Sequence, residues 1–553
     1  MKILKLTKME AIFLRKRKSI LFLLLVIVIC IFTACSTNEN SEKTISVYVG
    51  SEPESIDPAY NQTVDGATLL IHAFEGLMTL DKDGKPMLGQ AEKYSISDDG
   101  LTYTFTLRDD IKWSDGDPVK ADDFIYAWKR AIEYKNATVY GYLFDVIVGA
   151  GDIYGGVEGV TMDDFGARAI DDKTIEITLI APTPYFLELC AYPTYFPVRE
   201  DIVEDNDSWT INPDTYITNG PYKLESWTHN SEMIYVKNEN YYKYKDLGPD
   251  QIKFVLMTDA NAVLAAFQNG DILFSDDMPN EEIDAWREKP EFNIEGELGT
   301  YYISFNTEKE PFDNFKVRQA LSLAIDRNFI VEQIGRAGQQ PAPAFIPTGL
   351  TDADVTKEFR DVGGDYYSVA KGDYEKNLRE AKKLLAEAGY PEGKGFPKFE
   401  YMYNPEGSTH ALIGQALQDM WKELGIECTL VDQEWNTFLQ IRQDGNYQVA
   451  RNGWGADYDD PITFIDMFLS NSGHNNSQWK NAEYDKIVNK IKNSFDTEER
   501  FELMHEAEDL LMQEAPIAPI FYYVDIFLKS EKLEGFYSSP LGFKYFMYSS
   551  VSK

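Results

Sequence analysis

The sequence holds few of the residues that most often carry catalysis or bind metal ions. Five histidines and four cysteines occur among its 553 residues. It contains no His-Glu-x-x-His helix and no Cys-x-x-Cys pair, so it predicts no zinc site and no other cofactor. A Gly-x-Ser-x-Gly elbow and a phosphate-binding glycine loop are missing as well. These absences make an enzyme the less favoured class of protein.

Basic residues are also in short supply. The chain has 53 lysines and arginines against 91 acidic residues, which gives a formal net charge of −38. Seven of the basic residues but only one acidic residue lie within residues 1–34, so the rest of the chain is more negative still. Such a surface repels nucleic acid and anionic lipid headgroups. We therefore expect no nucleic-acid partner, and a solvated acidic surface explains most of the charge.

The N-terminal segment has the order of charge and hydrophobicity that is typical of a secretory signal. An uninterrupted apolar run at residues 20–32 follows the basic residues, and it is shorter than the roughly 20 residues that a transmembrane helix needs. Thr33 and Ala34 precede Cys35, an arrangement that resembles a lipoprotein cleavage box, although Phe32 stands where Leu is usual. We expect residues 1–34 to be a lipoprotein signal peptide. Lipid on Cys35 would anchor the protein to the extracytoplasmic face of the cell membrane. An uncleaved signal anchor is the alternative.

The remaining length and cysteines bear on the architecture. The chain beyond residue 34 is too long for a single core and suggests two or three domains. Cys190 and Cys428 lie in apolar surroundings and are predicted to be buried thiols. In the second half, helices alternate with strands, which favours an α/β fold with a mostly parallel sheet. We expect one long helix at residues 315–334, another helix at 435–442 and a strand at 447–450.

One stretch, residues 449–461, combines features of a ligand site. The strand expected at 447–450 leads into Gly453, Trp454 and Gly455, and Asp457 follows. Glycines allow a ligand or another backbone to approach closely. Trp454 offers a flat apolar wall, and a lone carboxylate beside it suits an ammonium group. Taken alone, the same residues also fit an ordinary polar turn.

Several blocks of sequence resemble the oligopeptide-binding proteins of bacterial ABC importers, which belong to the family 5 extracellular solute-binding proteins. The resemblance extends from about residue 44 to the C-terminus, and the blocks stand in the family's order. Besides residues 449–461, they are residues 55–58 (SIDP), 74–77 (FEGL), 112–116 (KWSDG), 218–222 (TNGPY), 315–321 (FKVRQAL), 381–390 (AKKLLAEAGY), 432–439 (DQEWNTFL) and 468–472 (FLSNS).

The resemblance implies an α/β fold of the periplasmic-binding-protein type II kind, with three lobes, mixed sheets and a ligand cleft closed by a hinge. Residues 35–43 would link the lipid anchor to a discontinuous domain I, formed by residues 44–74, 200–298 and 525–553. Domain II would comprise residues 75–199 and domain III residues 299–524. The ligand would be enclosed between domains I and III. One enterobacterial member carries a cysteine pair at the positions of Gly299 and Gly455, so that disulfide is missing from this sequence.

The resemblance also assigns contacts to the main chain of a bound peptide. Asp457 aligns with the carboxylate that anchors the α-amino group. Val64 of domain I aligns with a residue that contacts the peptide backbone, and Gly453 and Gly455 lie on the opposite wall. Tyr140 matches a tyrosine that contacts the ligand. An extended peptide held in this way resembles an added strand.

Other residues match the family's side-chain pockets and carboxylate anchors. Trp435 and Trp454 align with pocket aromatics, and core packing is the alternative for both. Arg451 and His410 align with cations that bind the peptide carboxylate at different peptide lengths. A third family cation, a lysine, falls on Gly335, which leaves the preferred length open.

Together these roles imply a monomeric, lipid-anchored binding protein that captures short peptides and delivers them to the permease subunits of an ABC importer. A narrower ligand in the same fold is one alternative: a dipeptide, a peptide pheromone or a metal chelate. An extracellular peptidase is the other, although the sequence offers no nucleophile or metal set for it.

Overall fold

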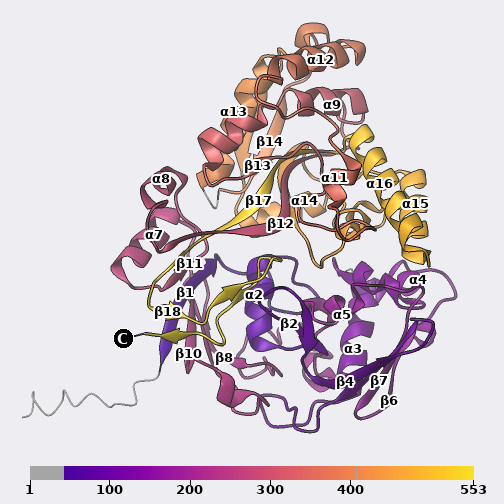
Figure 1. Cartoon of the computed structure of the whole chain (residues 1–553), viewed down its shortest axis with the longest axis vertical. Coiled ribbons are helices and arrows are strands. Elements are labelled where there is room, and N and C mark those ends of the chain that lie inside the picture. Colours follow the sequence, from indigo (N-terminus) through magenta and orange to yellow (C-terminus); the bar gives the residue numbers. More distant parts are fainter. Residues whose placement is uncertain (1–42, 137, 406–407, 553) are drawn as a thin grey trace, which may run out of the picture. The chain divides into compact units, whose positions relative to one another are not determined.

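Two long antiparallel strands, β12 (Phe292–Phe305) and β17 (Ile517–Lys529), join strands from distant parts of the chain (Figure 1). The computed structural model describes residues 43–136, 138–405 and 408–552. The predicted signal peptide, Cys35 and nearly all of the 35–43 linker lie outside the described residues. The strands that share a sheet with β12 and β17 are β1 (Thr44–Gly50), β8 (Tyr222–Thr228), β9 (Glu232–Lys237), β10 (Gln251–Leu256), β11 (Phe274–Ser275), β13 (Gln340–Pro341), β14 (Phe399–Tyr403), β15 (Cys428–Asp432) and β16 (Val449–Gly455).

This sheet is mixed, because it contains both parallel and antiparallel pairs of strands. Within the described ranges it has eleven strands in the order β15-β14-β16-β12-β17-β11-β1-β10-β9-β8, with β13 paired to β17. Helices α13 (Ser408–Lys422) and α14 (Trp435–Gln443) connect the parallel strands β14, β15 and β16, as their alternation predicts. β12 and β17 enter from outside that unit and run antiparallel to their neighbours. The expectation of a mostly parallel sheet was therefore wrong, and the mixed α/β fold is confirmed.

A smaller sheet lies in the chain segment between β1 and β8. It consists of β4 (Ala91–Ile96), β5 (Thr102–Leu107), β7 (Thr174–Thr178) and β6 (Ala167–Asp171), in that order. Helix α3 (Ala121–Ile132) packs against β6, because its apolar residues recur at helical spacing on one face. The hairpin of β2 (Met78–Leu80) and β3 (Pro86–Leu88) turns at Gly84, whose φ of 74° suits glycine.

The single helix expected at residues 315–334 is interrupted. α9 (Phe315–Leu323) ends before Asp326, α10 (Arg327–Phe329) begins after it, and a π-helical turn (Ile330–Gly335) follows. Asp326 caps the new helix by accepting a hydrogen bond from the Phe329 backbone N–H at 3.0 Å. The buried guanidinium of Arg327 donates to the carbonyls of Ser322 and Pro519. These polar contacts satisfy the carbonyl of the broken turn, and apolar periodicity alone does not reveal them.

The described chain has more than one apolar core. One large cluster surrounds β1, α3 and the C-terminal segment, and a second surrounds α9, α13 and β14 with Trp421 at its centre. Thr44–Lys553 nevertheless forms one compact unit, and the three-domain boundaries stay a prediction. None of the helices in the described ranges is long and apolar enough to cross a bilayer.

Candidate functional site

The carboxyl group of Asp457 is buried and only half satisfied. Asp457 follows β16 by two residues and is 5% exposed. Its Oδ1 accepts hydrogen bonds from the hydroxyl groups of Tyr192 at 2.7 Å and Tyr140 at 3.1 Å. Its Oδ2 has no hydrogen-bond partner among the described residues. A buried oxygen without a donor costs free energy, so this atom is a candidate acceptor for a ligand.

The surroundings of Asp457 disfavour its negative charge. Burial raises the pKa of this carboxyl group to about 7, although the hydrogen bonds from Tyr192 and Tyr140 lower it. The nearby Asp466 raises it further. A cation in contact with Oδ2 would stabilise the ionised form and supply the missing donor. The arrangement thus suits an ammonium group on a ligand.

A cavity of about 300 Å³ opens at this carboxyl group. The residues that line it come from both ends of the sequence and from its middle, and all of the predicted peptide contacts except His410 are among them. These lining residues are Val64, Tyr140, Trp435, Arg451, Gly453, Trp454, Gly455 and Asp457. The fold therefore brings together in one cavity residues that the resemblance assigned to one ligand site.

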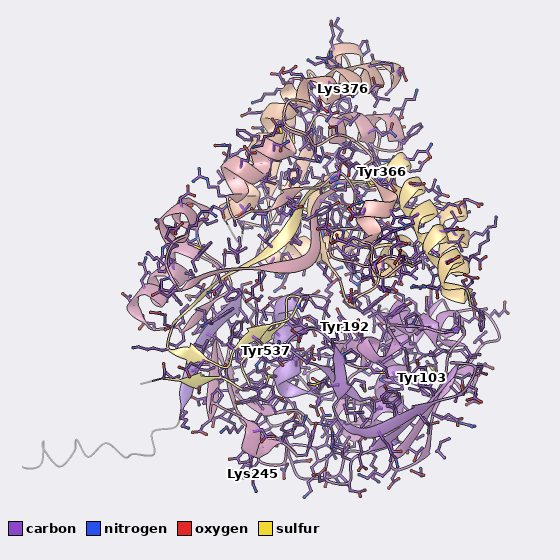
Figure 2. All side chains as sticks on the ribbon, viewed as in Figure 1. Tyr103, Tyr192, Lys245, Tyr366, Lys376 and Tyr537 are labelled. Atoms are coloured by element: carbon purple, nitrogen blue, oxygen red, sulfur yellow. The ribbon has the colours of Figure 1, made fainter. Side chains whose placement is uncertain are left out.

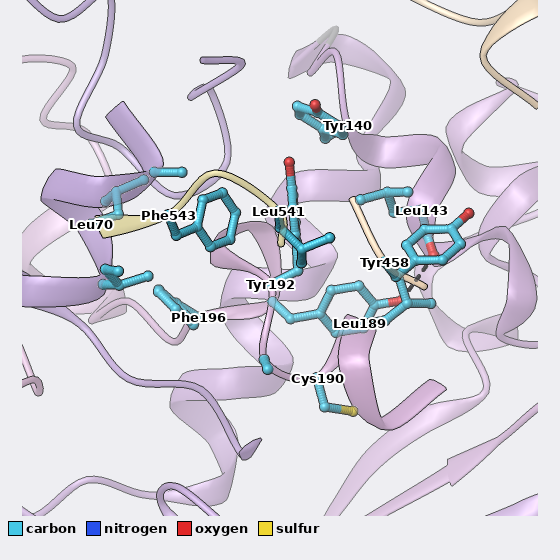
Figure 3. Close-up of a cluster of buried hydrophobic side chains, with 14 of the residues drawn as sticks. Leu70, Tyr140, Leu143, Leu189, Cys190, Tyr192, Phe196, Tyr458, Leu541 and Phe543 are labelled. Carbon is cyan, nitrogen blue, oxygen red and sulfur yellow. Dashed lines mark hydrogen bonds between the residues drawn. The ribbon is translucent and has the colours of Figure 1, made fainter. Parts of the chain in front are cut away.

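Tyr140 and Tyr192 lie side by side next to the cavity. Their ring centroids are 5.4 Å apart, and both hydroxyl groups reach Asp457. Figure 3 shows Tyr192 between Phe543 and Tyr458, at the edge of a buried apolar cluster that also includes Leu541. Figure 2 marks the same tyrosine among the side chains of the whole chain, and Tyr192 is buried. This packing fixes the direction of the tyrosine hydroxyl groups.

The two tryptophans of the site differ in burial. Trp454 is 7% exposed, donates from Nε1 to the Thr463 carbonyl at 2.9 Å, and packs edge-on against His474. It serves both the core and the cavity wall. Trp435 is only partly buried and stacks on Phe438 within α14. Trp454 thus packs in the core and also lines the cavity, which are the two interpretations that the sequence allowed.

The glycines of β16 meet different surroundings. β16 extends through Gly455, five residues beyond the predicted strand end at 450. A β-carbon on Gly453 would overlap the hydroxyl of Tyr523, and one on Gly299, opposite Gly455 in the sheet, would overlap the Tyr523 ring. A β-carbon on Gly455 would face open space, with Glu297 Oε1 nearest at 3.9 Å. Gly453 is therefore required by Tyr523, whereas Gly455 leaves room beside the cavity.

Val64 stands on the opposite wall at the start of α2 (Val64–Ala73). It is 40% exposed although it is apolar, and Thr63 caps the helix by accepting from the Gly66 backbone N–H. Val64 Cγ1 lies 3.2 Å from the position of a β-carbon on Gly542. An exposed valine on a cavity wall can contact a ligand backbone without competing for its hydrogen bonds.

Two arginines line the cavity and form no ion pair within the described residues. Arg451 lies over the Tyr301 and Trp435 rings, with its guanidinium carbon 5.4 and 5.9 Å from their centroids, and its Nε has no hydrogen-bond partner there. Arg442 is buried and donates to the Arg451 carbonyl at 3.3 Å, and its Nε is likewise unpartnered in the described chain. Burial and then repulsion from Arg451 lower the pKa of Arg442 to about 10. The pair can bind an anion.

His410 lies beside this region but does not line the cavity. Its Nδ1 is 3.3 Å from the Tyr301 hydroxyl, and burial lowers the pKa of the imidazole well below its usual value. A neutral imidazole has no positive charge with which to attract the carboxylate of a peptide. Arg336, next to Gly335, pairs with Asp284 at 3.6 Å. The structure thus groups Arg451 with the cavity and leaves His410 and Arg336 outside it.

Sequence reasoning missed Tyr192 and Arg442. Tyr192 is 265 residues from Asp457 in sequence and belongs to no motif, so no local signal could have found it. Arg442 had a signal: Trp435, Leu439 and Arg442 follow one another at helical spacing on α14, and all three line the cavity. Extending the predicted face of that helix would have included the arginine.

The possible metal ligands and the cysteines of the described chain form neither a metal site nor a disulfide. It holds no group of three or more His, Cys, Asp or Glu side chains placed to bind a metal ion. Cys190 and Cys428 are free and buried, which confirms that they are thiols.

Comparison with known proteins identifies the family to which this chain is similar. The model of the bacterial extracellular solute-binding proteins, family 5 (middle region), matches residues 85–476. The oligopeptide-binding protein OppA of Bacillus subtilis is 35% identical over 552 residues, which cover 96% of this chain and 99% of that protein. The dipeptide-binding protein DppE of the same organism is 36% identical over 506 residues, which cover 91% of each.

Two structures of one related protein differ in how well this chain superposes on them. The Escherichia coli murein tripeptide-binding protein MppA is 31% identical and superposes with a TM-score of 0.86, covering 93% of this chain and 99% of that one. A structure of MppA in its unliganded open form, with the same identity and similar coverage, gives a TM-score of only 0.62. The described chain thus superposes less well on that open form than on the first structure.

Proposed function

This chain belongs to the bacterial extracellular solute-binding proteins of family 5, and on that premise we propose that it captures short peptides in extended form between two lobes and delivers them to the permease of an ABC importer. The observation that carries the proposal is the buried, unpartnered Oδ2 of Asp457 in a cavity lined by Val64, Gly455 and Arg451. A peptide α-ammonium supplies the donor and the charge that this oxygen lacks. At about 4 Å and an effective dielectric of 20 the gross attraction is about 4 kcal/mol, and desolvation opposes it.

The opposite end of the peptide would meet arginine. Arg451 and Asp457 line the same cavity, so a peptide held at its amino end by Asp457 would find a cation for its carboxylate on the wall that carries Arg451. Backbone hydrogen bonds along the walls, each contributing on the order of 1 kcal/mol, would bind peptides without reading every side chain.

A dipeptide is the second candidate ligand, because the dipeptide-binding protein DppE is as similar to this chain as OppA is. The Asp457 anchor serves either ligand. The preferred peptide length would then depend on which cation binds the carboxylate of the peptide. An extracellular peptidase is the weaker alternative, and a turnover assay that yields product at a catalytic rate would establish it.

The test is to purify the full chain from cells, denature it and analyse the released small molecules by mass spectrometry. We expect a mixture of short peptides clustered in length. Dipeptides alone would favour the second candidate. No released peptide, together with no binding of a peptide panel in calorimetric titrations, would overturn the proposed function.

A further inference from the structure

A second cavity of about 430 Å³ adjoins the first one. The two share Glu297, Tyr523 and Leu541 in their linings. The second cavity is closed by the β2–β3 hairpin turn, by α5 (Phe186–Leu189), and by the strands β12 and β17. The two cavities therefore share part of one wall.

The lining of this second cavity contains four acidic residues. It includes Asp83, Glu188, Glu297 and Asp459, and no lysine or arginine is among its lining residues in the described chain. Asp83 pairs with Lys82 at 2.9 Å. The other three carboxylates form no ion pair within the described ranges, and Glu188 accepts one hydrogen bond, from the Asp459 backbone N–H at 2.7 Å.

Glu297 is the acid nearest the expected path of the peptide. Its strand pairs with β16 so that Gly299 lies opposite Gly455, and the Ala456 backbone N–H donates to the Leu298 carbonyl at 2.7 Å. Glu297 lies two residues before Gly299 on β12. Its Oε1 lies 3.9 Å from the position of a β-carbon on Gly455 and 3.8 Å from one on Gly542. The carboxylate sits between the two walls that flank the ligand.

We propose that this second cavity is a subsite for the cationic side chain of a lysine or arginine in the first three positions of the bound peptide, an inference that rests on the proposed function. The unpartnered Oδ2 of the buried Asp457, in the adjoining cavity, is the sign that a ligand passes this wall. An extended peptide anchored there advances by about 3.3 Å per residue, so its first side chains pass Glu297. The cavity is large enough for a guanidinium with water around it.

Electrostatics favours a cation over a neutral side chain here. Burial raises the pKa of Glu297 to about 7 and that of Glu188 to about 7. Asp525 raises the pKa of Glu297 further, and Lys544, which pairs with Asp525 and Asp276, lowers it. Lys85 lowers the pKa of Glu188 from an exposed position. A bound ammonium or guanidinium would stabilise the ionised forms of Glu297 and Glu188, and the strongly negative chain attracts such ligands from a distance.

The test uses calorimetric titration of the full chain with three sets of tetra-alanine peptides. Each set carries lysine, norleucine or glutamate at position 1, 2 or 3, so that lysine and norleucine differ only in the ammonium group. We expect lysine to bind about tenfold more tightly than norleucine at one position, the size of a partly exposed charge-assisted hydrogen bond. Glutamate should bind most weakly there.

The variants assign the effect to residues. Glu297→Gln should make the affinities for the lysine and norleucine peptides nearly equal, so that their ratio is close to one. Glu188→Gln should reduce that ratio. Glu295→Gln, an identical change at an exposed position of the same strand, should leave the ratio unchanged. Equal affinities for lysine and norleucine at all three positions, or a ratio that Glu297→Gln and Glu188→Gln leave intact, would overturn the subsite while the proposed function stands. Failure of every peptide to bind the unaltered chain would overturn both.

Discussion

The hydroxyl group of Tyr192 donates to Asp457 Oδ1 across 2.7 Å, although 265 residues separate the two in the sequence. In the predicted division of the chain, Tyr192 belongs to domain II and Asp457 to domain III. The same carboxyl group leaves its other oxygen for the cavity. One carboxyl group is therefore placed to bind a ligand and to link two predicted domains.

Asp457→Asn keeps the size of the side chain and removes its charge. We expect the Kd for peptides with a free amino terminus to rise about 10- to 100-fold, because a buried charge-assisted hydrogen bond is lost. The Kd for the same peptides with an acetylated amino terminus should not rise. Asp419→Asn, at an exposed position of α13, is the control. An equal loss for free and acetylated peptides would contradict the role of Asp457 as an amino anchor.

Tyr192→Phe removes one of the two hydroxyl groups that donate to Asp457 Oδ1. We expect peptide affinity to fall about three- to tenfold, because one hydrogen bond that orients Asp457 disappears. Tyr195→Phe removes a buried hydroxyl that donates to the Leu143 carbonyl at 2.9 Å, away from Asp457. That control should lower the free energy of unfolding by about 1 kcal/mol and leave the Kd unchanged. Calorimetry and urea unfolding on both variants separate the two effects.

The raised pKa of Asp457 predicts how the stability of the ligand-free protein depends on pH. Between the unfolded value of 3.8 and the folded value of about 7, the folded carboxyl keeps a proton that the unfolded one releases. The contribution of Asp457 to the free energy of unfolding therefore falls as pH rises through this window, by about 1.4 kcal/mol per pH unit. From pH 5 to pH 7 the loss is about 2 to 3 kcal/mol.

The measurement compares urea unfolding of the unaltered chain and Asp457→Asn at pH 5 and pH 7. His72 and His474 act in the opposite direction, because burial lowers the pKa of these imidazoles to about 4 and about 3. Both variants share that effect, so the difference between them isolates Asp457. A difference that does not change with pH would contradict the raised pKa.

A buried lysine joins two predicted lobes without touching the cavity. Lys492 in α15 (Ala482–Asn493) lies 3.3 Å from Asp145 and 3.4 Å from Asp466. Lys492→Met leaves two buried acids uncompensated, so the free energy of unfolding should fall by about 3 to 5 kcal/mol. Because Asp145 lies in predicted domain II and Lys492 in predicted domain III, peptide affinity should fall as well.

The matched control is the buried pair of Arg360 and Glu508, whose closest atoms are 2.7 Å apart and which lies wholly within predicted domain III. Arg360→Met should cost comparable stability, measured by urea unfolding, and leave the peptide Kd unchanged. Equal effects of the two variants on affinity would mean that the lysine has no special part in closing the cleft.

Cys35 lies outside the described residues, and its lipidation is tested in cells. We expect radiolabelled palmitate in the unaltered chain and none in Cys35→Ser, which should also leave the membrane fraction. Cys30→Ser, within the apolar run, is the control and should keep the label. Label retained in Cys35→Ser would favour the uncleaved signal anchor.

The sequence predicted local features of the site better than contacts across the chain. The apolar and glycine pattern of residues 447–457 is local and predicted a strand, although β16 extends through the glycines, five residues beyond the expected end. Tyr192 gave no signal, since only tertiary folding brings it to Asp457. The break at Asp326 was missed because its compensation lies in the distant Pro519 carbonyl, which accepts from Arg327. Periodicity records which face of an element is buried and not which polar atoms meet there.

Tyr523 lies over Gly299 and Gly453, where β-carbons would overlap it. A β-carbon at position 299 or 453 can therefore be accommodated only if the Tyr523 ring moves. Because Tyr523 lines both cavities, replacing either glycine should reshape the wall that the two cavities share.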